Sequence, residues 1–172
     1  NCAYLASQYM LGDSLLVAPI FNEDGIAEYY LPGGRWTSLL SGDVKEGGRW
    51  YKEKHGYLSI PLYVRAGSIV AMGARDDNAV YDYADGTTFR VYALDDGCEA
   101  QTTVYDTENR EAVKAAVTHC GSRYEIQVSG GTEVKVALMH AGMPKTVSCA
   151  YEMDGDHAVI AVPKEGNVTV EF

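Results

Sequence analysis

Carboxylate side chains are the most abundant groups in this sequence that could do chemistry. Of its 172 residues, 24 are acidic, and the densest groups are Asp76-Asp77, Asp82 with Asp85, and Asp95-Asp96. Two carboxylates about 5 Å apart can act as nucleophile and acid/base, and several together can hold Ca²⁺. All of these groups lie in turn-like sequence without the spacing of an EF-hand loop. We therefore predict solvated turn residues that hydrogen-bond their own backbone, with calcium binding as the alternative.

The tripeptide Gly-Arg-Trp occurs twice and ends at Trp36 and at Trp50. An indole ring can stack on a sugar ring, and a neighbouring arginine can bind sugar hydroxyls. These two tryptophans are therefore the candidates for a sugar-binding site. We favour a packing role for both, because tryptophan is a large apolar anchor between sheets.

Histidine and cysteine offer another set of ligand atoms. His119, His140 and His157 stand in or beside predicted strands, and Cys120 and Cys149 lie in the same part of the chain. Their spacing matches no zinc-ligand pattern, and no C-x-x-C motif occurs. We therefore predict ordinary strand residues and no metal site. The cysteines are expected to be buried as small apolar side chains, with a disulfide only in an oxidising compartment.

Several classes of function find no support in the sequence. It contains neither a G-x-S-x-G nucleophile motif nor a phosphate-binding glycine loop. The net charge of −10 argues against a nucleic-acid partner, because binding phosphates needs clustered Lys and Arg. No apolar run approaches the roughly 20 residues that span a bilayer, and we find no secretory signal. We expect no cofactor, no membrane partner and a cytoplasmic location.

Short apolar runs and alternating segments, separated by turn signals, fill most of the chain. Strands are predicted at residues 15–20, 28–31, 35–40, 49–52, 61–64 and 68–72. After Thr87, apolar and polar residues alternate with a period of two, which is typical of strands packed on one face. The segment 107–118 has a helix-like composition, but we predict a strand from Ala112 to Thr118.

The predicted fold is all-β, with two consecutive antiparallel β-sandwich-like domains. Their boundary is expected in the polar, acidic stretch 74–86, so that the proximal domain spans 14–79 and the distal domain 80–172. Residues 1–13 are expected to form a short helix, because Tyr4, Gln8 and Leu11 can share one face. The sequence opens inside this segment, so we expect more chain before it.

Four segments resemble the C-terminal β region of glycoside hydrolase family 31. They are QYMLGDSLLVAPIF (8–21), YLPGGRW (30–36), SGDVKEGGRW (41–50) and HGYLSIPLYVRAGSIVAMG (55–73). The HGYLS form and the segment YDYADGTTFRVYALDDGCEA (81–100) resemble the bacterial α-xylosidase branch more than the α-glucosidases. From the start of the chain to about Ala100, the resemblance rests on specific motifs. Beyond Ala100, only the pattern of strands is similar.

This resemblance implies a parent enzyme with a (β/α)₈ barrel and a retaining mechanism on terminal α-xylosides of xylo-oligosaccharides. Its nucleophile and acid/base would lie on barrel strands upstream of Asn1, and residues 1–13 would be the end of that barrel. None of the family's catalytic motifs is found here, so we expect no catalytic residue. The chain would then be a non-catalytic region of a bacterial enzyme that supports the barrel and contributes to subunit contacts. The alternatives are a carbohydrate-binding module using Trp36 and Trp50, and a parent that is an α-glucosidase.

Overall fold

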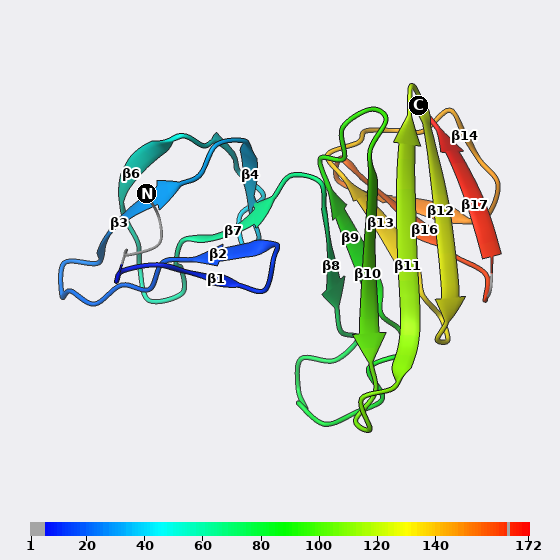
Figure 1. Ribbon diagram of the computed structural model, residues 1–172, viewed down its shortest axis with the longest axis horizontal. Helices are drawn as coiled ribbons and strands as arrows, with labels where there is room; N and C mark the ends of the chain where they lie inside the picture. Colours follow the sequence, from blue (N-terminus) through cyan, green and yellow to red (C-terminus); the bar gives the residue numbers. More distant parts are fainter. Residues whose placement is uncertain (1–5, 165) are drawn as a thin grey trace. The chain divides into compact units, whose positions relative to one another are not determined.

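All regular structure in the described residues is β-strand. The computed structural model describes residues 6–164 and 166–172 (Figure 1), and this confirms the all-β prediction. No helix in the described part of the chain is long and apolar enough to cross a membrane. The chain divides into two compact units, Asn1–Ala66 and Gly67–Phe172, which we call unit 1 and unit 2.

The segment expected to be a short helix is a strand where the structure describes it. Tyr9–Leu11 forms β1, which pairs antiparallel with β2 (Leu15–Val17). Gly12, in the turn between these strands, has a φ of 64°, in the left-handed region that favours glycine. The helix prediction is wrong at β1, because pairing with β2 satisfies its backbone groups instead. The part of that prediction at residues 1–5 lies outside the described residues.

Unit 1 contains one five-stranded and one two-stranded sheet. The bounds of its other strands are Ile26–Leu31 for β3, Arg35–Ser38 for β4, Val44–Glu46 for β5, Arg49–Lys54 for β6 and Leu62–Arg65 for β7. The larger sheet has the order β1-β2-β7-β4-β5, and β3 pairs with β6.

The core of unit 1 is small and rich in aromatic residues. In β3, the alternation sends Ala27, Tyr29 and Leu31 inward, and Trp36 of β4 joins them from the larger sheet. Tyr51 packs against this core from β6. Burial of these few large side chains is the main source of stability for unit 1.

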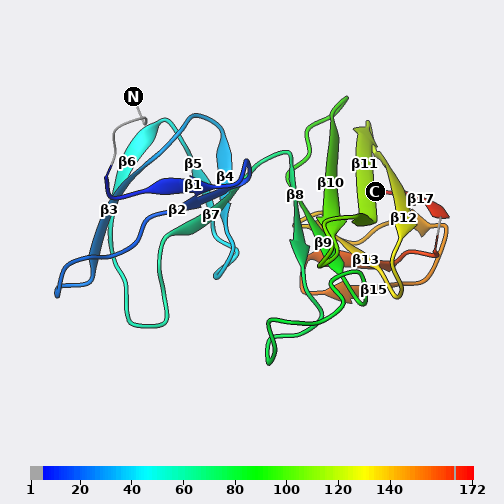
Figure 2. The same ribbon diagram turned by 60° about the horizontal axis from the view of Figure 1, so that its bottom comes forward.

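Unit 2 is a β-sandwich of two five-stranded sheets, which Figure 2 shows as two layers. The strand bounds are Ser68–Met72 for β8, Thr88–Tyr92 for β9, Glu99–Tyr105 for β10, Glu111–Cys120 for β11, Arg123–Gly130 for β12, Lys135–Met139 for β13, Thr146–Val147 for β14, Tyr151–Asp154 for β15, His157–Ala161 for β16 and Gly166–Glu171 for β17. One sheet has the order β10-β11-β12-β17-β14 and the other β15-β16-β13-β9-β8. The strand predicted at residues 112–118 is confirmed as part of β11.

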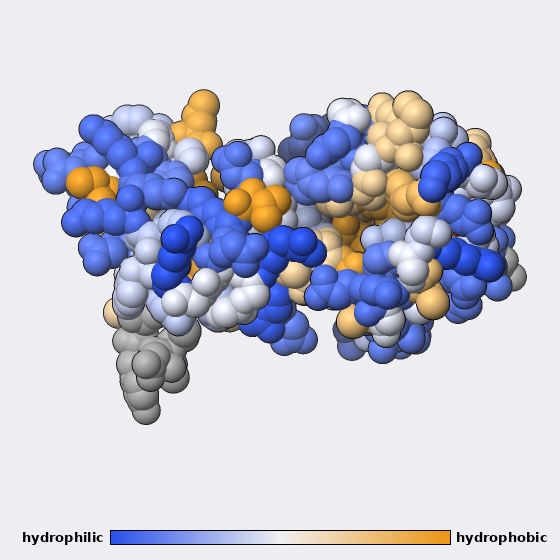
Figure 3. Space-filling model, turned by 90° about the horizontal axis from the view of Figure 1, so that it is seen from above, coloured by the Kyte–Doolittle hydropathy of each residue, from blue (hydrophilic) through white to orange (hydrophobic). Residues whose placement is uncertain are grey.

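The inward faces of the two sheets form a continuous aliphatic core. Phe89 and Val136 contribute from one sheet, and Val117, Ile126 and Val168 from the other. Neighbouring strands pair antiparallel except β9 and β13, which pair parallel with Thr88 opposite Lys135. On the face seen in Figure 3, hydrophilic residues cover most of the surface and hydrophobic residues form limited patches, as expected for an acidic, solvated chain.

The boundary between the units lies earlier than the expected boundary after Ala79. β8 belongs to unit 2, because it pairs with β9 through Ser68 opposite Tyr92 and Met72 opposite Thr88. The acidic stretch 74–86 is a connection within unit 2 rather than a linker. Within it, the rings of Tyr81 and Tyr83 meet edge to face with their centres 5.0 Å apart.

Candidate functional site

The two Gly-Arg-Trp copies place their tryptophans in opposite environments. Trp36 is 0% exposed, and its Nε1 donates a hydrogen bond to the carbonyl oxygen of Pro32 at 2.8 Å. The guanidinium of Arg65 lies 5.3 Å from the centre of its ring. Trp36 is therefore a core anchor and cannot stack on a sugar.

Trp50 lies on the outer face of the β3–β6 pair and is 53% exposed. Side chains alternate along β6, so its neighbour Tyr51 faces the core while Trp50 faces solvent. Its register partner on β3 is Tyr30, whose ring centre lies 5.7 Å away. An exposed indole supported by a second aromatic ring is a stacking platform.

A groove of about 570 Å³ adjoins this platform in unit 1. Trp50, Phe21, Asp24 and the cross-strand pair Glu28–Lys52 contribute to its lining. The Glu28 carboxylate and the Lys52 ammonium lie 3.7 Å apart and are both largely exposed. The groove thus combines apolar ring faces with charged groups at its rim, an arrangement that can hold a small polar ligand.

A network of charged and phenolic groups lies on the inner side of the same two strands. Glu53 forms an ion pair with Lys45 and accepts a hydrogen bond from the Tyr29 hydroxyl at 2.6 Å. The Tyr29 and Tyr63 hydroxyls are 3.0 Å apart. The Lys45 ammonium also lies 4.7 Å from the ring centre of Tyr51. The sequence analysis did not identify this network, because its members come from separate strands.

The protonation states of the network follow from its contacts. Burial raises the pKa of Tyr29, and the hydrogen bonds with Glu53 and Tyr63 raise it further, so this hydroxyl stays neutral. Burial alone would raise the pKa of Glu53, but hydrogen bonds from Lys45 and Tyr29 lower it overall. Burial would likewise lower the pKa of Lys45, but its bonds raise it. The charges are thus fixed across the neutral pH range, as in a structural ion pair.

The clustered carboxylates behave as turn residues. Asp82 accepts a hydrogen bond from the backbone N–H of Ala84 at 3.0 Å, and Asp96 accepts one from Gly121 at 2.6 Å. Asp85 bonds the Thr132 hydroxyl. Asp77 pairs with Arg75 at 3.0 Å, which lowers the pKa of the Asp77 carboxyl. Asp77 and Asp82 thus make local turn contacts, whereas Asp85 and Asp96 bind residues distant in the sequence.

The three histidines lie in or beside strands as predicted, with His119 in β11, His140 directly after β13 and His157 at the start of β16. His140 and His157 lie together with Asp156, a residue that the sequence analysis did not single out. The His119 ring instead stacks on Tyr124 with their centres 4.1 Å apart.

Burial was expected for all four cysteines; it is wrong for Cys98 and Cys120, and Cys2 lies outside the described residues. Cys98 and Cys120 are exposed free thiols, because Cys98 lies just before the start of β10 and Cys120 is the last residue of β11. Cys149 is half-buried and packs against the core, where burial raises the pKa of its thiol.

Comparison with known families gives matches over both units. Residues 1–70 match the model of the glycosyl hydrolase family 31 C-terminal domain. Residues 82–172 match the model named alpha-xylosidase YicI, C-terminal domain. Together these matches cover most of the chain.

Individual proteins similar to the chain include two α-xylosidases. The chain is 35% identical over 138 residues to alpha-xylosidase XylQ of Lactiplantibacillus pentosus, and 34% identical over 146 residues to an α-xylosidase of Emericella nidulans. These alignments cover 78% and 80% of this chain but only 18% of each relative. A dextranase structure from Flavobacterium johnsoniae superimposes with a TM-score of 0.80 at 17% identity, covering 96% of this chain and 27% of that one. This last likeness shows the fold alone.

Proposed function

The chain belongs to glycoside hydrolase family 31, as an α-xylosidase-like C-terminal region, and from this premise we propose that it is the non-catalytic β region of an enzyme that hydrolyses terminal α-xylosidic bonds. Its task is to support the catalytic barrel of that enzyme. The chain spans about a fifth of the length of the α-xylosidases that it resembles. We infer that the catalytic carboxylates lie in the rest of the parent enzyme.

The observation that carries this proposal is the set of exposed large apolar side chains on two adjacent loops of unit 1. One loop follows β2 and carries Phe21, which is 80% exposed. The other joins β6 to β7 and carries Tyr57 and Leu58, which are 109% and 98% exposed. Backbone hydrogen bonds tie the loops together, from Ala18 to Pro61 at 3.0 Å among others.

Large apolar side chains at such exposure are costly in water unless another surface covers them. A catalytic barrel is the occupant that fits, because the related enzymes contain far more chain than is present here. Covering these loops would bury their rings and aliphatic groups in the same way as a domain interface.

We expect the chain alone to show no hydrolysis of p-nitrophenyl α-xyloside and to self-associate through these loops. Replacing Tyr57 and Leu58 together with asparagine should remove most of the association and of the binding of a hydrophobic dye. The physical reason is that the double substitution removes the apolar area that drives contact. Sedimentation velocity over a range of concentrations and dye fluorescence measure the two effects.

The matched control is Met143→Gln, which removes a 74% exposed apolar side chain from unit 2 and should leave association unchanged. A chain that stays monomeric at every concentration and binds no dye would contradict the interface. Measurable hydrolysis by the purified chain would contradict the non-catalytic role.

A second candidate function, carbohydrate binding, rests on the groove beside Trp50. The favouring observation is the 53% exposed indole next to Phe21, with the Glu28–Lys52 pair at the rim. Xyloglucan oligosaccharides are the ligands to test, since they carry the α-xylosyl units of the proposed parent substrate.

If the groove binds sugar, Trp50→Ala should weaken binding at least tenfold, because an aromatic anchor dominates such contacts. Isothermal titration at millimolar oligosaccharide measures this, and Val44→Ala on β5 is the control, since Val44 is similarly exposed but does not line the groove. The absence of heat at millimolar sugar would exclude this function.

A further inference from the structure

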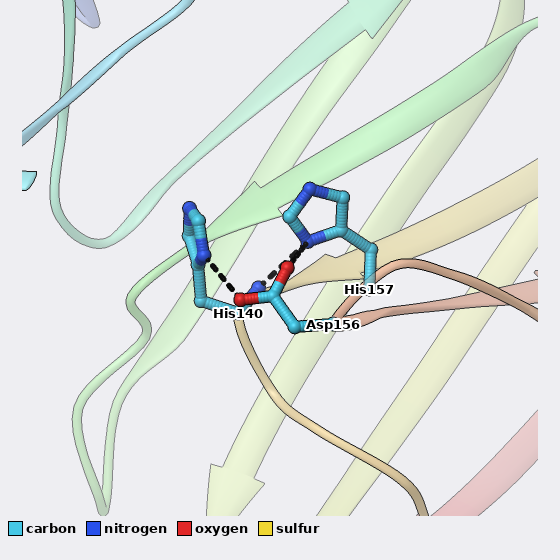
Figure 4. Close-up of side chains that lie close together, drawn as sticks. All are labelled: His140, Asp156 and His157. Atoms are coloured by element: carbon cyan, nitrogen blue, oxygen red, sulfur yellow. Dashed lines mark hydrogen bonds and ion pairs between the residues drawn. The ribbon is translucent and has the colours of Figure 1, made fainter. Parts of the chain in front are cut away.

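Three side chains with metal-ligating atoms meet at one end of unit 2 (Figure 4). β13 and β16 pair antiparallel with Leu138 opposite Ala158. Extending this register past the end of β13 places His140 beside the residues that open β16. A two-residue turn at Gly155 and Asp156 joins β15 to β16, so Asp156 and His157 arrive at the same place.

The Asp156 carboxylate lies between the two imidazole rings. Its Oδ2 is 2.7 Å from Nδ1 of His140, and its Oδ1 is 2.8 Å from Nδ1 of His157. The ring planes are nearly perpendicular, at 89°, with centres 4.8 Å apart. One ligand atom from each residue lies within 4.8 Å of the others. A single small ion can therefore contact all three residues after minor side-chain rotation.

The hydrogen-bond pattern gives this cluster an excess of acceptors. The backbone N–H of His140 donates to Nδ1 of His157 at 3.1 Å, which occupies the lone pair of that nitrogen and leaves Nε2 of His157 to bind an ion. The Asp156 oxygen beside it is also an acceptor when the carboxyl is ionised.

The chemistry of the donors selects the class of ion. Neutral imidazole together with carboxylate favours Zn²⁺ and neighbouring transition metals, whereas Ca²⁺ and Mg²⁺ prefer oxygen ligands alone. The three side chains are 32%, 59% and 23% exposed for His140, Asp156 and His157. Solvent therefore reaches the cluster, and water can complete the coordination of an ion.

We propose that His140, Asp156 and His157 form a binding site for a divalent transition-metal ion of the Zn²⁺ class. The ion would connect the end of β13 with the β15–β16 turn. These two segments belong to the same sheet but are separated in sequence by the loop that contains β14. The proposal does not depend on glycosidase activity or on the interface of unit 1.

The test is isothermal titration of the tag-free chain with zinc chloride at pH 7.5, in a Cys98→Ser/Cys120→Ser background that removes the two thiols exposed in the described part of the chain. We expect one ion per chain. His140→Gly, Asp156→Asn and His157→Gln should each weaken binding at least tenfold, because each removes a ligand. At zinc 100-fold above Kd, the melting temperature of unit 2 should rise by about 10 °C.

His140→Gly is the most informative variant, because His140 has a φ of 56° that glycine adopts without strain. It removes the imidazole while leaving the turn free to form, and the melting curve without zinc checks that the fold remains. His119→Gln is the control, since His119 lies in the same unit but outside the cluster, and its variant should bind normally. Zinc binding that survives all three ligand substitutions, or no binding at millimolar zinc, would overturn the proposal.

Discussion

Replacing Trp36 with alanine should lower the free energy of unfolding of unit 1 by about 3–5 kcal/mol. Trp36 is 0% exposed and anchors a core of few side chains. Loss of its indole N–H would also leave the Pro32 carbonyl oxygen without a hydrogen-bond donor. A domain of this size has a stability of only about 3–10 kcal/mol. We therefore expect unit 1 to be largely unfolded in this variant while unit 2 remains folded.

Tryptophan fluorescence measures this selectively, because both tryptophans of the chain lie in unit 1. Each single variant keeps one tryptophan as a reporter, and circular dichroism follows both units. The matched control is Trp50→Ala in the other Gly-Arg-Trp copy, which should cost less than about 1 kcal/mol, since the 53% exposed indole loses little burial. If urea denaturation shows that the two variants lose the same free energy of unfolding, Trp36 is not the anchor of this core.

Replacing Glu53 with glutamine should lower the free energy of unfolding of unit 1 by about 2 kcal/mol. The Lys45 side chain is only 16% exposed, and the substitution leaves its ammonium without a carboxylate partner. Breaking a fully buried ion pair costs about 3–5 kcal/mol of folding stability. We expect a smaller loss here, because Glu53 is 34% exposed and water screens its charge. Urea denaturation at pH 7, followed by fluorescence, gives the difference.

The pH dependence has a definite sign. The pKa of Glu53 is lowered in the folded state, so its contribution is present above its unfolded pKa of about 4.3 and is lost as pH falls through the lower folded value. The pKa of Lys45 is raised, so its contribution is present below about 10.4 and is lost as pH rises through the higher folded value. The difference in stability between the original chain and Glu53→Gln should therefore be present at neutral pH, where both contributions are present, and close in acid.

The control for this pair is Glu28→Gln, which removes a charge from the same two strands on their outer face. The Glu28 and Lys52 side chains are 61% and 67% exposed, and surface pairs of this kind contribute about 0–1 kcal/mol. If Glu28→Gln and Glu53→Gln destabilise unit 1 equally, or if the Glu53 effect persists in acid, the inner network does not have the role assigned to it.

The strands of unit 2 were predictable because a sheet packed on one face imposes a two-residue alternation on its sequence. The segment at residues 112–118 shows this, since Val113, Ala115 and Val117 all face the core despite a helix-like composition. The strand at Tyr9–Leu11 was not predictable in the same way. All three residues are apolar and exposed, so the segment has no alternation, and only its pairing with β2 makes it a strand.

The sites were harder to predict than the strands, because they depend on register. Two identical tripeptides gave one buried and one exposed tryptophan, since Tyr51 rather than Trp50 takes the inward position on β6. His140 and His157 are brought together by the pairing of β13 with β16, across the intervening strands β14 and β15. The Asp-Gly turn before Asp156 was visible in the sequence, but it did not indicate which strand would lie alongside.

The position of β17 within its sheet sets the order in which the two units can fold during synthesis. β17 lies between β12 and β14, so the core on this side closes only after residues 166–171 are available. The parallel pairing of β9 with β13 also joins segments far apart in sequence, which slows folding. Unit 1 is complete at Ala66 and can fold while the ribosome is still translating unit 2. Until residues 166–171 are synthesised, the apolar face of the nascent β8–β9 pair stays uncovered. The chain is then most prone to aggregation and to chaperone binding.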